Sequence, residues 1–264
     1  MRAHYLALAL TLCLSAAAQD AAPAYSSTGF LNACNLANGP FAPNTVVSVY
    51  GSAMAWSNYS LAASDIAGGN LPTNLNGVEV VVNNVPAPLY MVSTGQINFL
   101  MPTNLIAGPV AVRVVRQGIV GPEVDLKVQA AAPALFATPG AADYAIAQQW
   151  PQYSAITPDT PTTPGSIVVL YASGLGRTDP YPSQSTEIPI YPGVLEAIQS
   201  FQILLNGVPL DPSKVLYAGI CPGGTGLYQV NLILPADVGP DPEIRLAVGT
   251  SVSAPGTKLA VTTQ

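Results

Sequence analysis

Short runs of Val, Ile, Leu, Tyr and Thr, separated by turn-forming residues, are the dominant pattern along this chain. The runs have the length of β-strands, and the 23 glycines and 26 prolines leave little room for helix-length amphipathic segments. Several runs alternate in part between apolar and polar positions, as a half-buried strand does. The pattern predicts an all-β protein with strands at 45–50, 77–83, 96–101, 109–116 and 123–129.

The second half of the chain repeats the first half in the same order. Three matches carry the repeat: 43–52 with 164–173, 83–86 with 206–209, and 96–102 with 229–235. The spacing between matching segments grows along the chain, so the second copy contains an insertion. Most of it falls between Val208 and Gln229, where a Gly-rich stretch carries Cys221. Because repeats define architecture, we expect two similar units rather than one irregular domain.

Each unit has the size and the strand grammar of an immunoglobulin-like sandwich. The sequence therefore predicts two tandem immunoglobulin-like β-sandwich domains, with the first at 19–139 and the second at 140–264. A single large sandwich or barrel that uses both halves remains an alternative. The glycines of the segment 174–177, which follows an expected strand, favour a tight turn, since no helix follows them as a nucleotide-binding loop would require.

Residues 1–18 have the features of a signal peptide: Arg2, an apolar core at 5–14, and alanines at 16–18 before Gln19. This apolar run is too short to span a bilayer, and no later uninterrupted apolar run reaches the about 18 to 20 residues that a span requires. We therefore expect a protein that is secreted or held in the cell envelope (periplasmic or extracellular), without membrane insertion.

The repeated segments also resemble a known family, the Solibacter-type uncharacterised C-terminal domain of secreted bacterial proteins, which is related to IPT/TIG immunoglobulin-like modules. The resemblance covers nearly all of the chain after the signal. It implies tandem immunoglobulin-like folding and an extracellular or envelope location, and it brings no functional residues with it. The segments that carry it are 31–33, 43–52, 77–78, 85–88, 96–99, 132–136, 164–166, 174–176, 217–219 and 226–231.

Charge and composition narrow the range of partners. The chain is 49% hydrophobic and only 8% charged, with a net charge of -6. Its eight basic residues are spread thinly, so the sequence has no basic patch for a phosphate backbone or an anionic membrane. We expect neither nucleic acid nor membrane as a partner, and instead an unknown protein or carbohydrate.

The residue types argue against most catalysis. The only histidine, His4, lies in the signal, so the exported chain has no imidazole for a Ser or Cys triad or for a zinc site. Asp237, Asp241 and Glu243 could offer oxygen ligands to calcium, but their spacing does not match an EF-hand loop, and a solvated turn after a strand explains them better. We expect no cofactor, no metal and no enzyme. The alternative is a hydrolase or lyase that acts on extracellular polysaccharide with two carboxylates.

Two further sets of residues are candidates for a structural or binding role. Cys34 and Cys221 would form a disulfide in an oxidising compartment or remain two separate thiols. Aromatic residues in loop-like stretches could stack on sugars, anchor a protein, or simply cover the ends of the sandwiches: Trp56, Tyr59, Trp150, Tyr153, Tyr181 and Tyr191. Taken together, the sequence predicts a non-catalytic extracellular module for adhesion, carbohydrate or protein recognition, or surface assembly.

Overall fold

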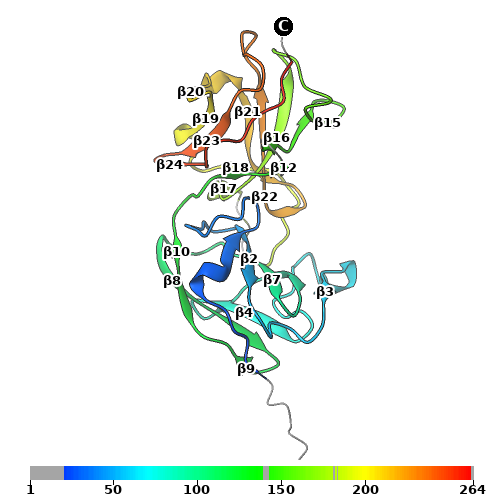
Figure 1. Ribbon diagram of the computed structural model, residues 1–264, viewed down its shortest axis with the longest axis vertical. Coiled ribbons are helices and arrows are strands. Elements are labelled where there is room, and N and C mark those ends of the chain that lie inside the picture. Colours follow the sequence, from blue (N-terminus) through cyan, green and yellow to red (C-terminus); the bar gives the residue numbers. More distant parts are fainter. Residues whose placement is uncertain (1–20, 139–142, 181, 183, 263–264) are drawn as a thin grey trace, which may run out of the picture.

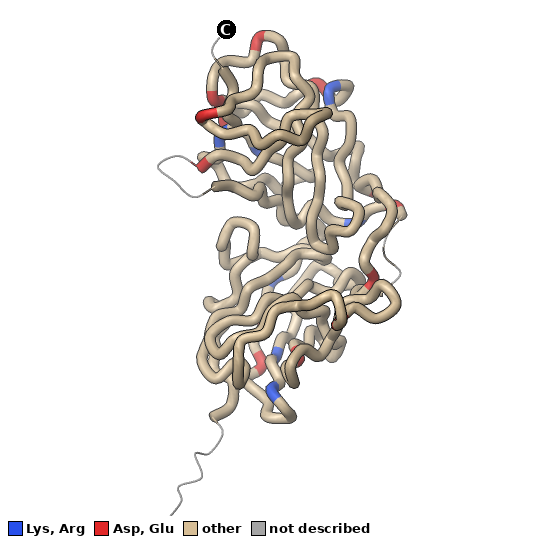
Figure 2. Tube along the Cα trace, turned by 90° about the vertical axis from the view of Figure 1, so that its right-hand side faces the viewer, with Lys and Arg blue, Asp and Glu red and all other residues tan. Residues whose placement is uncertain are grey.

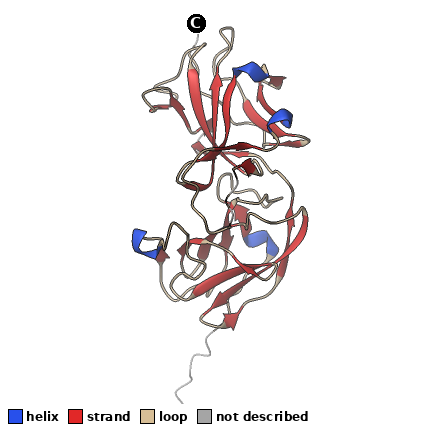
Figure 3. Ribbon diagram, turned by 180° about the vertical axis from the view of Figure 1, so that it is seen from behind, coloured by secondary structure: helices blue, strands red, loops and turns tan. Residues whose placement is uncertain are grey.

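The computed structural model describes residues 21–138, 143–180, 182 and 184–262. They form two immunoglobulin-like β-sandwiches in tandem, stacked along the long axis of the molecule (Figure 1). The fold class predicted from the sequence is confirmed. The described helices are single 3-10 turns between strands (Figure 3): η1 (Ser27–Gly29), η2 (Ala63–Asp65), η3 (Ile198–Ser200) and η4 (Pro212–Lys214). The predicted signal peptide at 1–18 lies outside the described residues.

The first domain contains two antiparallel sheets. One has the order β1 (Phe30–Asn32), β2 (Val46–Tyr50), β7 (Gln96–Leu100), β6 (Leu89–Val92) and β3 (Tyr59–Ser60). The other has the order β10 (Val124–Val128), β8 (Gly108–Arg116), β4 (Val78–Val82) and β5 (Val85–Pro86), and β9 (Ile119–Val120) also pairs with β8. Inward-facing residues of both sheets, from Phe30 to Val128, form one buried cluster.

The second domain is built in the same way but with a larger first sheet. Its order is β15 (Ser154–Ile156), β14 (Ala147–Gln149), β16 (Ile167–Ser173), β22 (Gly224–Ile233), β21 (Val215–Cys221), β18 (Gly193–Leu195) and β17 (Thr178–Asp179). The facing sheet is β20 (Val208–Pro209), β19 (Phe201–Leu205), β23 (Ile244–Val248) and β24 (Ser251–Val252). A separate short pair joins β12 (Ala137–Thr138) to β13 (Tyr144–Ala145).

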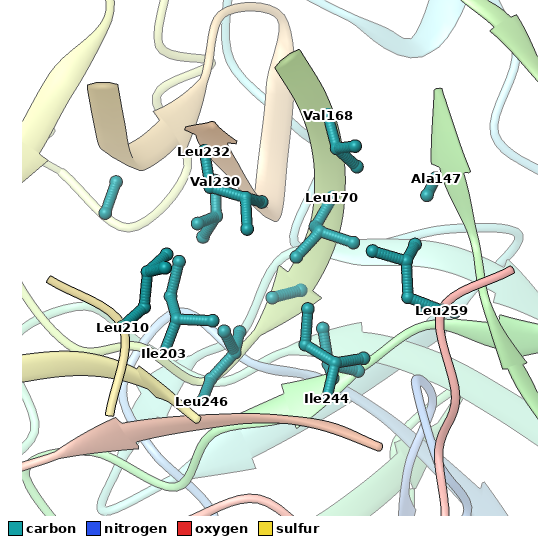
Figure 4. Close-up of a cluster of buried hydrophobic side chains, with 14 of the residues drawn as sticks. Ala147, Val168, Leu170, Ile203, Leu210, Val230, Leu232, Ile244, Leu246 and Leu259 are labelled. Carbon is teal, nitrogen blue, oxygen red and sulfur yellow. The ribbon is translucent and has the colours of Figure 1, made fainter. Parts of the chain in front are cut away.

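The core of the second domain lies between these two sheets (Figure 4). Val168 and Leu170 of β16 face Ile203 of β19 and Leu246 of β23, and all four are fully buried. Because side chains alternate across a strand, the residues between them point to the opposite face of the sheet. Burial of each such aliphatic side chain stabilises the fold by about 1.5–3 kcal/mol.

The repeat seen in the sequence has a direct structural counterpart. In the first domain β2 pairs with β7, with Tyr50 opposite Gln96 and Ser48 opposite Asn98. In the second domain β16 pairs with β22, with Tyr171 opposite Gln229. The matching strands are therefore central in both sandwiches and keep the same register.

The second domain begins before the predicted boundary at 139/140. β11 (Ala134–Leu135) pairs with β16, and Ala131 and Leu135 belong to the buried cluster of the second domain. Residues 139–142 themselves lie outside the described residues. Along the chain, the change from the first buried cluster to the second falls between Val128 and Ala131.

Two glycines allow the linker to pack closely against the second domain. Gly174 has φ +72° and Gly176 has φ +93°, conformations that residues with a side chain rarely adopt. A Cβ atom at Gly174 would lie 2.2 Å from the carbonyl oxygen of Ala132, and one at Gly176 would lie 2.9 Å from that of Ala130. The predicted turn at 174–177 is thus the place where the linker crosses the end of β16.

The insertion in the second copy lengthens one hairpin. In the first domain, residues 93–96 lie between Val92 of β6 and its partner Ile97 of β7. In the second domain the equivalent pair is Ala218 of β21 and Val230 of β22, and residues 219–229 lie between them. The longer hairpin reaches the first domain. The hydroxyl of Tyr90 donates a 2.8 Å hydrogen bond to the Thr225 carbonyl, and Gly226 leaves no room for a side chain beside Val46.

A buried tyrosine on this hairpin joins both domains. Tyr228 is fully buried, its hydroxyl donates to the Gly176 carbonyl, and the Asn44 carboxamide donates to the same hydroxyl at 3.3 Å. We call the contact zone formed by the hairpin and the first domain the seam. The sequence located the insertion, and the structure shows that it builds the seam.

The loop of the second domain that precedes β18 also contacts the first domain. The amide of Leu71 donates to the Thr186 carbonyl at 2.8 Å, and the amide of Thr103 donates to the Ser185 hydroxyl at 2.9 Å. The Ile188 amide donates in turn to the Gly69 carbonyl at 2.9 Å. The two sandwiches therefore contact each other at this loop as well as at the hairpin.

Candidate binding face on the second domain

Polar and aromatic side chains cover the side of the large sheet that is turned away from the core of the second domain. They come from four adjacent strands, β14, β16, β22 and β21, and none of them is charged at neutral pH. We call this set the outer face: Gln148, Tyr171, Gln229, Asn231, Tyr217 and Cys221.

The register of the strands places these side chains side by side. Gln148 lies opposite Val169, which lies opposite Asn231, so the three form a row across the sheet. Tyr171 and Gln229 form the next row. Val169 has no exposed surface, so its polar neighbours must pack over it. The outer face is therefore a continuous layer of side chains rather than isolated groups.

Hydrogen bonds fix the orientation of this layer. The Tyr171 hydroxyl donates to Gln148 Oε1 at 2.6 Å, and Gln229 Nε2 donates to Asn231 Oδ1 at 2.9 Å. Both acceptors are amide oxygens, so the amide nitrogens of Gln148 and Asn231 are left as donors without a partner among the described residues. These two amides can donate to a ligand without losing an internal hydrogen bond.

An aromatic pair stands at the edge of the outer face. Trp150 and Tyr153 lie in the tight turn between β14 and β15, which is closed by a 2.7 Å hydrogen bond from the Tyr153 amide to the Gln149 carbonyl. Their rings meet edge to face with centroids 5.3 Å apart, and the residues remain 43% and 45% exposed. The structure thus brings together two of the predicted aromatic residues and presents them to solvent.

Burial and neighbouring groups keep the outer face neutral. Burial raises the pKa of Tyr171, and the nearby Cys221 and Tyr153 raise that pKa further. Burial also raises the pKa of Tyr217 and of the Cys221 thiol. Since each ordinary pKa already lies above neutrality, these groups carry no charge at physiological pH. Charged residues are sparse over the rest of the molecule as well (Figure 2).

The other predicted aromatic residues lie apart from this face. Trp56 is in the first domain, where the Arg116 guanidinium stacks 3.9 Å from its ring and its indole nitrogen donates to Gln117 at 3.1 Å. Tyr59 donates to the Asp65 carboxylate, which raises the pKa of the tyrosine. Tyr191 is 70% exposed in the loop before β18. Tyr181 lies outside the described residues.

The first domain carries a reduced version of the same face. Gln96 Nε2 donates to Asn98 Oδ1 at 2.8 Å, as Gln229 does to Asn231, and Tyr50 occupies the position of Tyr171. No described aromatic pair stands beside Tyr50. The sequence analysis did not single out these residues, although the repeated Tyr and the repeated Gln-x-Asn were visible in it.

The predicted disulfide is not formed. Cys34 belongs to the turn after β1 in the first domain, whereas Cys221 ends β21 in the second, and both are free, half-buried thiols. The Cys221 thiol contacts the amide oxygen of Gln229 at 3.7 Å. Burial raises the pKa of the Cys34 thiol well above its usual range. An even cysteine count suggested the bond, but the two residues lie on different sandwiches.

Two of the three acidic residues considered for calcium make structural hydrogen bonds. Asp241 accepts a 3.0 Å hydrogen bond from the Tyr144 hydroxyl, and Glu243 accepts one of 2.7 Å from the Gly256 amide. Within the described part of the chain, no three His, Cys, Asp or Glu residues group as metal ligands would. Among the same residues, no helix has the length and apolarity needed to cross a membrane.

Comparison with known proteins identifies no family. No family model matches the chain, and no curated protein matches its sequence. The resemblance to the Solibacter-type domain therefore stays a prediction.

Several solved structures show weak similarity to the chain. The mixed-linkage glucan-binding protein SGBP-B of Bacteroides ovatus is 9% identical, with a TM-score of 0.32 over 85% of this chain and 43% of that one. The surface glycan-binding protein PbSGBP-B of Prevotella bryantii is 9% identical, with a TM-score of 0.27 over 89% and 41%. The tandem Ig repeats of Dlar are 14% identical, with a TM-score of 0.20 over 84% and 92%. This chain spans less than half of either glycan-binding protein.

Proposed function

We propose that this protein is a non-catalytic extracellular module that binds a neutral polysaccharide through the outer face and its adjoining aromatic pair. The observation that carries the proposal is the combination of exposed rings and free amide donors on one flat sheet. Trp150 and Tyr153 supply apolar surface with polar tips, while Gln148 and Asn231 supply donors beside them.

The chemistry of sugars fits such a surface. The apolar side of a pyranose ring packs on an aromatic ring, and its hydroxyls hydrogen-bond to amides, which donate and accept at once. A flat sheet face suits the side of an extended polymer better than a single chain end. The absence of charged side chains from the outer face favours a neutral glycan over an acidic or sulfated one, because a bound anion would have no cation to pair with.

The test is binding of the exported protein to insoluble and soluble polysaccharides, by pull-down and affinity electrophoresis. The panel pairs neutral polymers (β-glucan, xylan, mannan) with acidic ones (alginate, polygalacturonate). We expect retardation by at least one neutral polymer and weaker or no retardation by the acidic ones. A steady release of reducing sugar during the assay would contradict the non-catalytic assignment and support a carboxylate-dependent hydrolase.

Matched tryptophan variants locate the site. Trp150→Ala is expected to weaken binding by about tenfold or more, since exposed aromatic residues are the usual anchors of such interfaces. Trp56→Ala is the control, because Trp56 is equally exposed but lies in the other domain. Equal losses in the two variants, or a loss only in Trp56→Ala, would move the site away from the outer face.

A further inference from the structure

A polar cleft lies between the two domains on the side of the β1 and β24 edges, away from the hairpin that builds the seam. Its volume is about 380 Å³, within the range of small-molecule sites. The first domain contributes Asn32, Asn35 and Gln129, and the second contributes Thr250 and Ser251. We call it the seam cleft. The function proposed above does not use it.

Asn32 is the best-defined polar group of the seam cleft. The residue is only 3% exposed, and its Oδ1 accepts a 2.8 Å hydrogen bond from the Cys34 amide, which fixes the carboxamide. The amide nitrogen on the other side has no acceptor among the described residues. Because Asn32 lines the cleft, this nitrogen can donate to an acceptor on a ligand without breaking an internal hydrogen bond.

Three other polar side chains of the seam cleft are also available. Gln129, Thr250 and Ser251 make no side-chain hydrogen bond within the described chain, and all three line the cleft. Amides and hydroxyls both donate and accept, so together with Asn32 they can pair with a ligand that carries several hydroxyl groups. Such a set is poorly suited to an apolar guest, which would leave these groups desolvated and unpaired.

The walls of the seam cleft define the charge of the ligand. None of the lining residues is acidic or basic, and the other walls are formed by small or rigid residues such as Pro40, Ala132 and Pro133. A carboxylate, sulfate or phosphate would enter without a counterion, whereas a neutral polyol would be matched. We propose that the seam cleft binds a neutral mono- or disaccharide unit, held by Asn32 and Gln129 on one side and Ser251 on the other.

Because both domains line the cleft, a bound sugar would bridge them. The test uses ¹⁵N-labelled protein and follows the side-chain amide signals of Asn32 and Gln129. The probes are maltotriose, cellotriose, xylotriose and mannotriose, with tri-galacturonate as the anionic control. At least one neutral trisaccharide is expected to shift both amide signals in a saturable manner, and tri-galacturonate is expected to shift neither.

Variants separate this site from the outer face. Gln129→Ala and Ser251→Ala should each weaken the saturable shift of Asn32 by about three- to tenfold, the equivalent of one neutral hydrogen bond. Trp150→Ala should leave it unchanged. The proposal is overturned if no neutral probe shifts Asn32, if both cleft variants bind as the parent does, or if Trp150→Ala abolishes the shift. The last result would assign all sugar binding to the outer face.

Discussion

The two domains are copies that differ most where they meet. Their central strand pairs share a register, with Tyr50 opposite Gln96 in one and Tyr171 opposite Gln229 in the other. The connecting hairpin, however, is short at 93–96 and long at 219–229. A duplicated sandwich keeps its own core, but it gains an interface only by adding residues that the original did not need. The insertion in the second copy supplies those residues.

The same comparison explains why one outer face is the better candidate. In the first domain the Ser48 hydroxyl donates to Asn98 Oδ1, which also accepts from Gln96, so this oxygen carries one more internal hydrogen bond than Asn231 Oδ1 does. In the second domain Val169 replaces that serine, and the turn between β14 and β15 adds Trp150 and Tyr153 beside the row. The proposed binding face thus differs from its counterpart in the first domain mainly by the aromatic turn added to a shared framework.

Shortening a buried side chain at equivalent positions of the two domains tests whether contacts across the seam make the domains unfold together. Leu170→Ala is expected to cost about 2–5 kcal/mol in free energy of unfolding, and Val49→Ala, at the matching position of the repeat, roughly 1–3 kcal/mol. Both residues are fully buried. If the seam couples the domains, either variant lowers the urea midpoint of the whole molecule.

The two tryptophans provide the readout, since Trp56 lies in the first domain and Trp150 in the second. Trp56→Phe and Trp150→Phe backgrounds report each domain separately by fluorescence. We expect the two reporters to give one midpoint in every variant. Separate midpoints, with each core variant shifting only its own domain, would show that the seam is energetically weak.

Removal of one hydroxyl tests the seam directly. Tyr228→Phe should cost about 1–3 kcal/mol, because it leaves the Gly176 carbonyl and the Asn44 amide without their buried partner. Tyr50→Phe is the control, since Tyr50 is 40% exposed and should change the unfolding free energy by less than about 0.5 kcal/mol. Equal changes in the free energy of unfolding in the two variants would show that the Tyr228 hydroxyl stabilises the protein no more than an exposed hydroxyl does.

Among the described residues, one surface ion pair is seen in each domain, and the smallest effect is expected there. Arg113 and Glu123 lie 2.9 Å apart in the first domain, and Arg177 and Glu196 lie 3.4 Å apart in the second. Glu123→Gln and Glu196→Gln should each cost less than about 1 kcal/mol, because both pairs are well exposed to solvent. The cost should shrink further in high salt. A larger loss for Glu196→Gln would mean that this pair supports the seam.

The fold was predictable because inward and outward positions alternate in the same way in both copies. Val49 and Leu170 occupy equivalent inward positions, and the surrounding turns repeat as well, so sequence alone revealed two sandwiches and the place of the insertion. Which residues of the first domain the insertion contacts depends on how the two domains are oriented relative to each other. That orientation is decided by many weak contacts across the seam, and no local pattern encodes it.

The candidate site was predictable only in part. Trp150 and Tyr153 were expected from their place in a loop, but the neighbouring Gln148 and Tyr171 looked like ordinary strand residues. Their role follows from strand register, which sequence gives only when pairing partners are known. The state of Cys34 and Cys221 could not be predicted for a related reason. A disulfide requires a Cα separation below about 7 Å, and a count of cysteines does not measure that distance.

The seam also has a mechanical meaning. Residue 21 lies at the far end of the first sandwich, where the Arg116 guanidinium holds its carbonyl at 2.8 Å, and residue 262 lies at the opposite end of the second (Figure 1). Tension applied between these ends must pass through the seam. The hydrogen bonds of Leu71, Thr103 and Ile188 then share the load with the covalent linker, so they would rupture before either core is pulled open. The molecule would extend first by parting its domains.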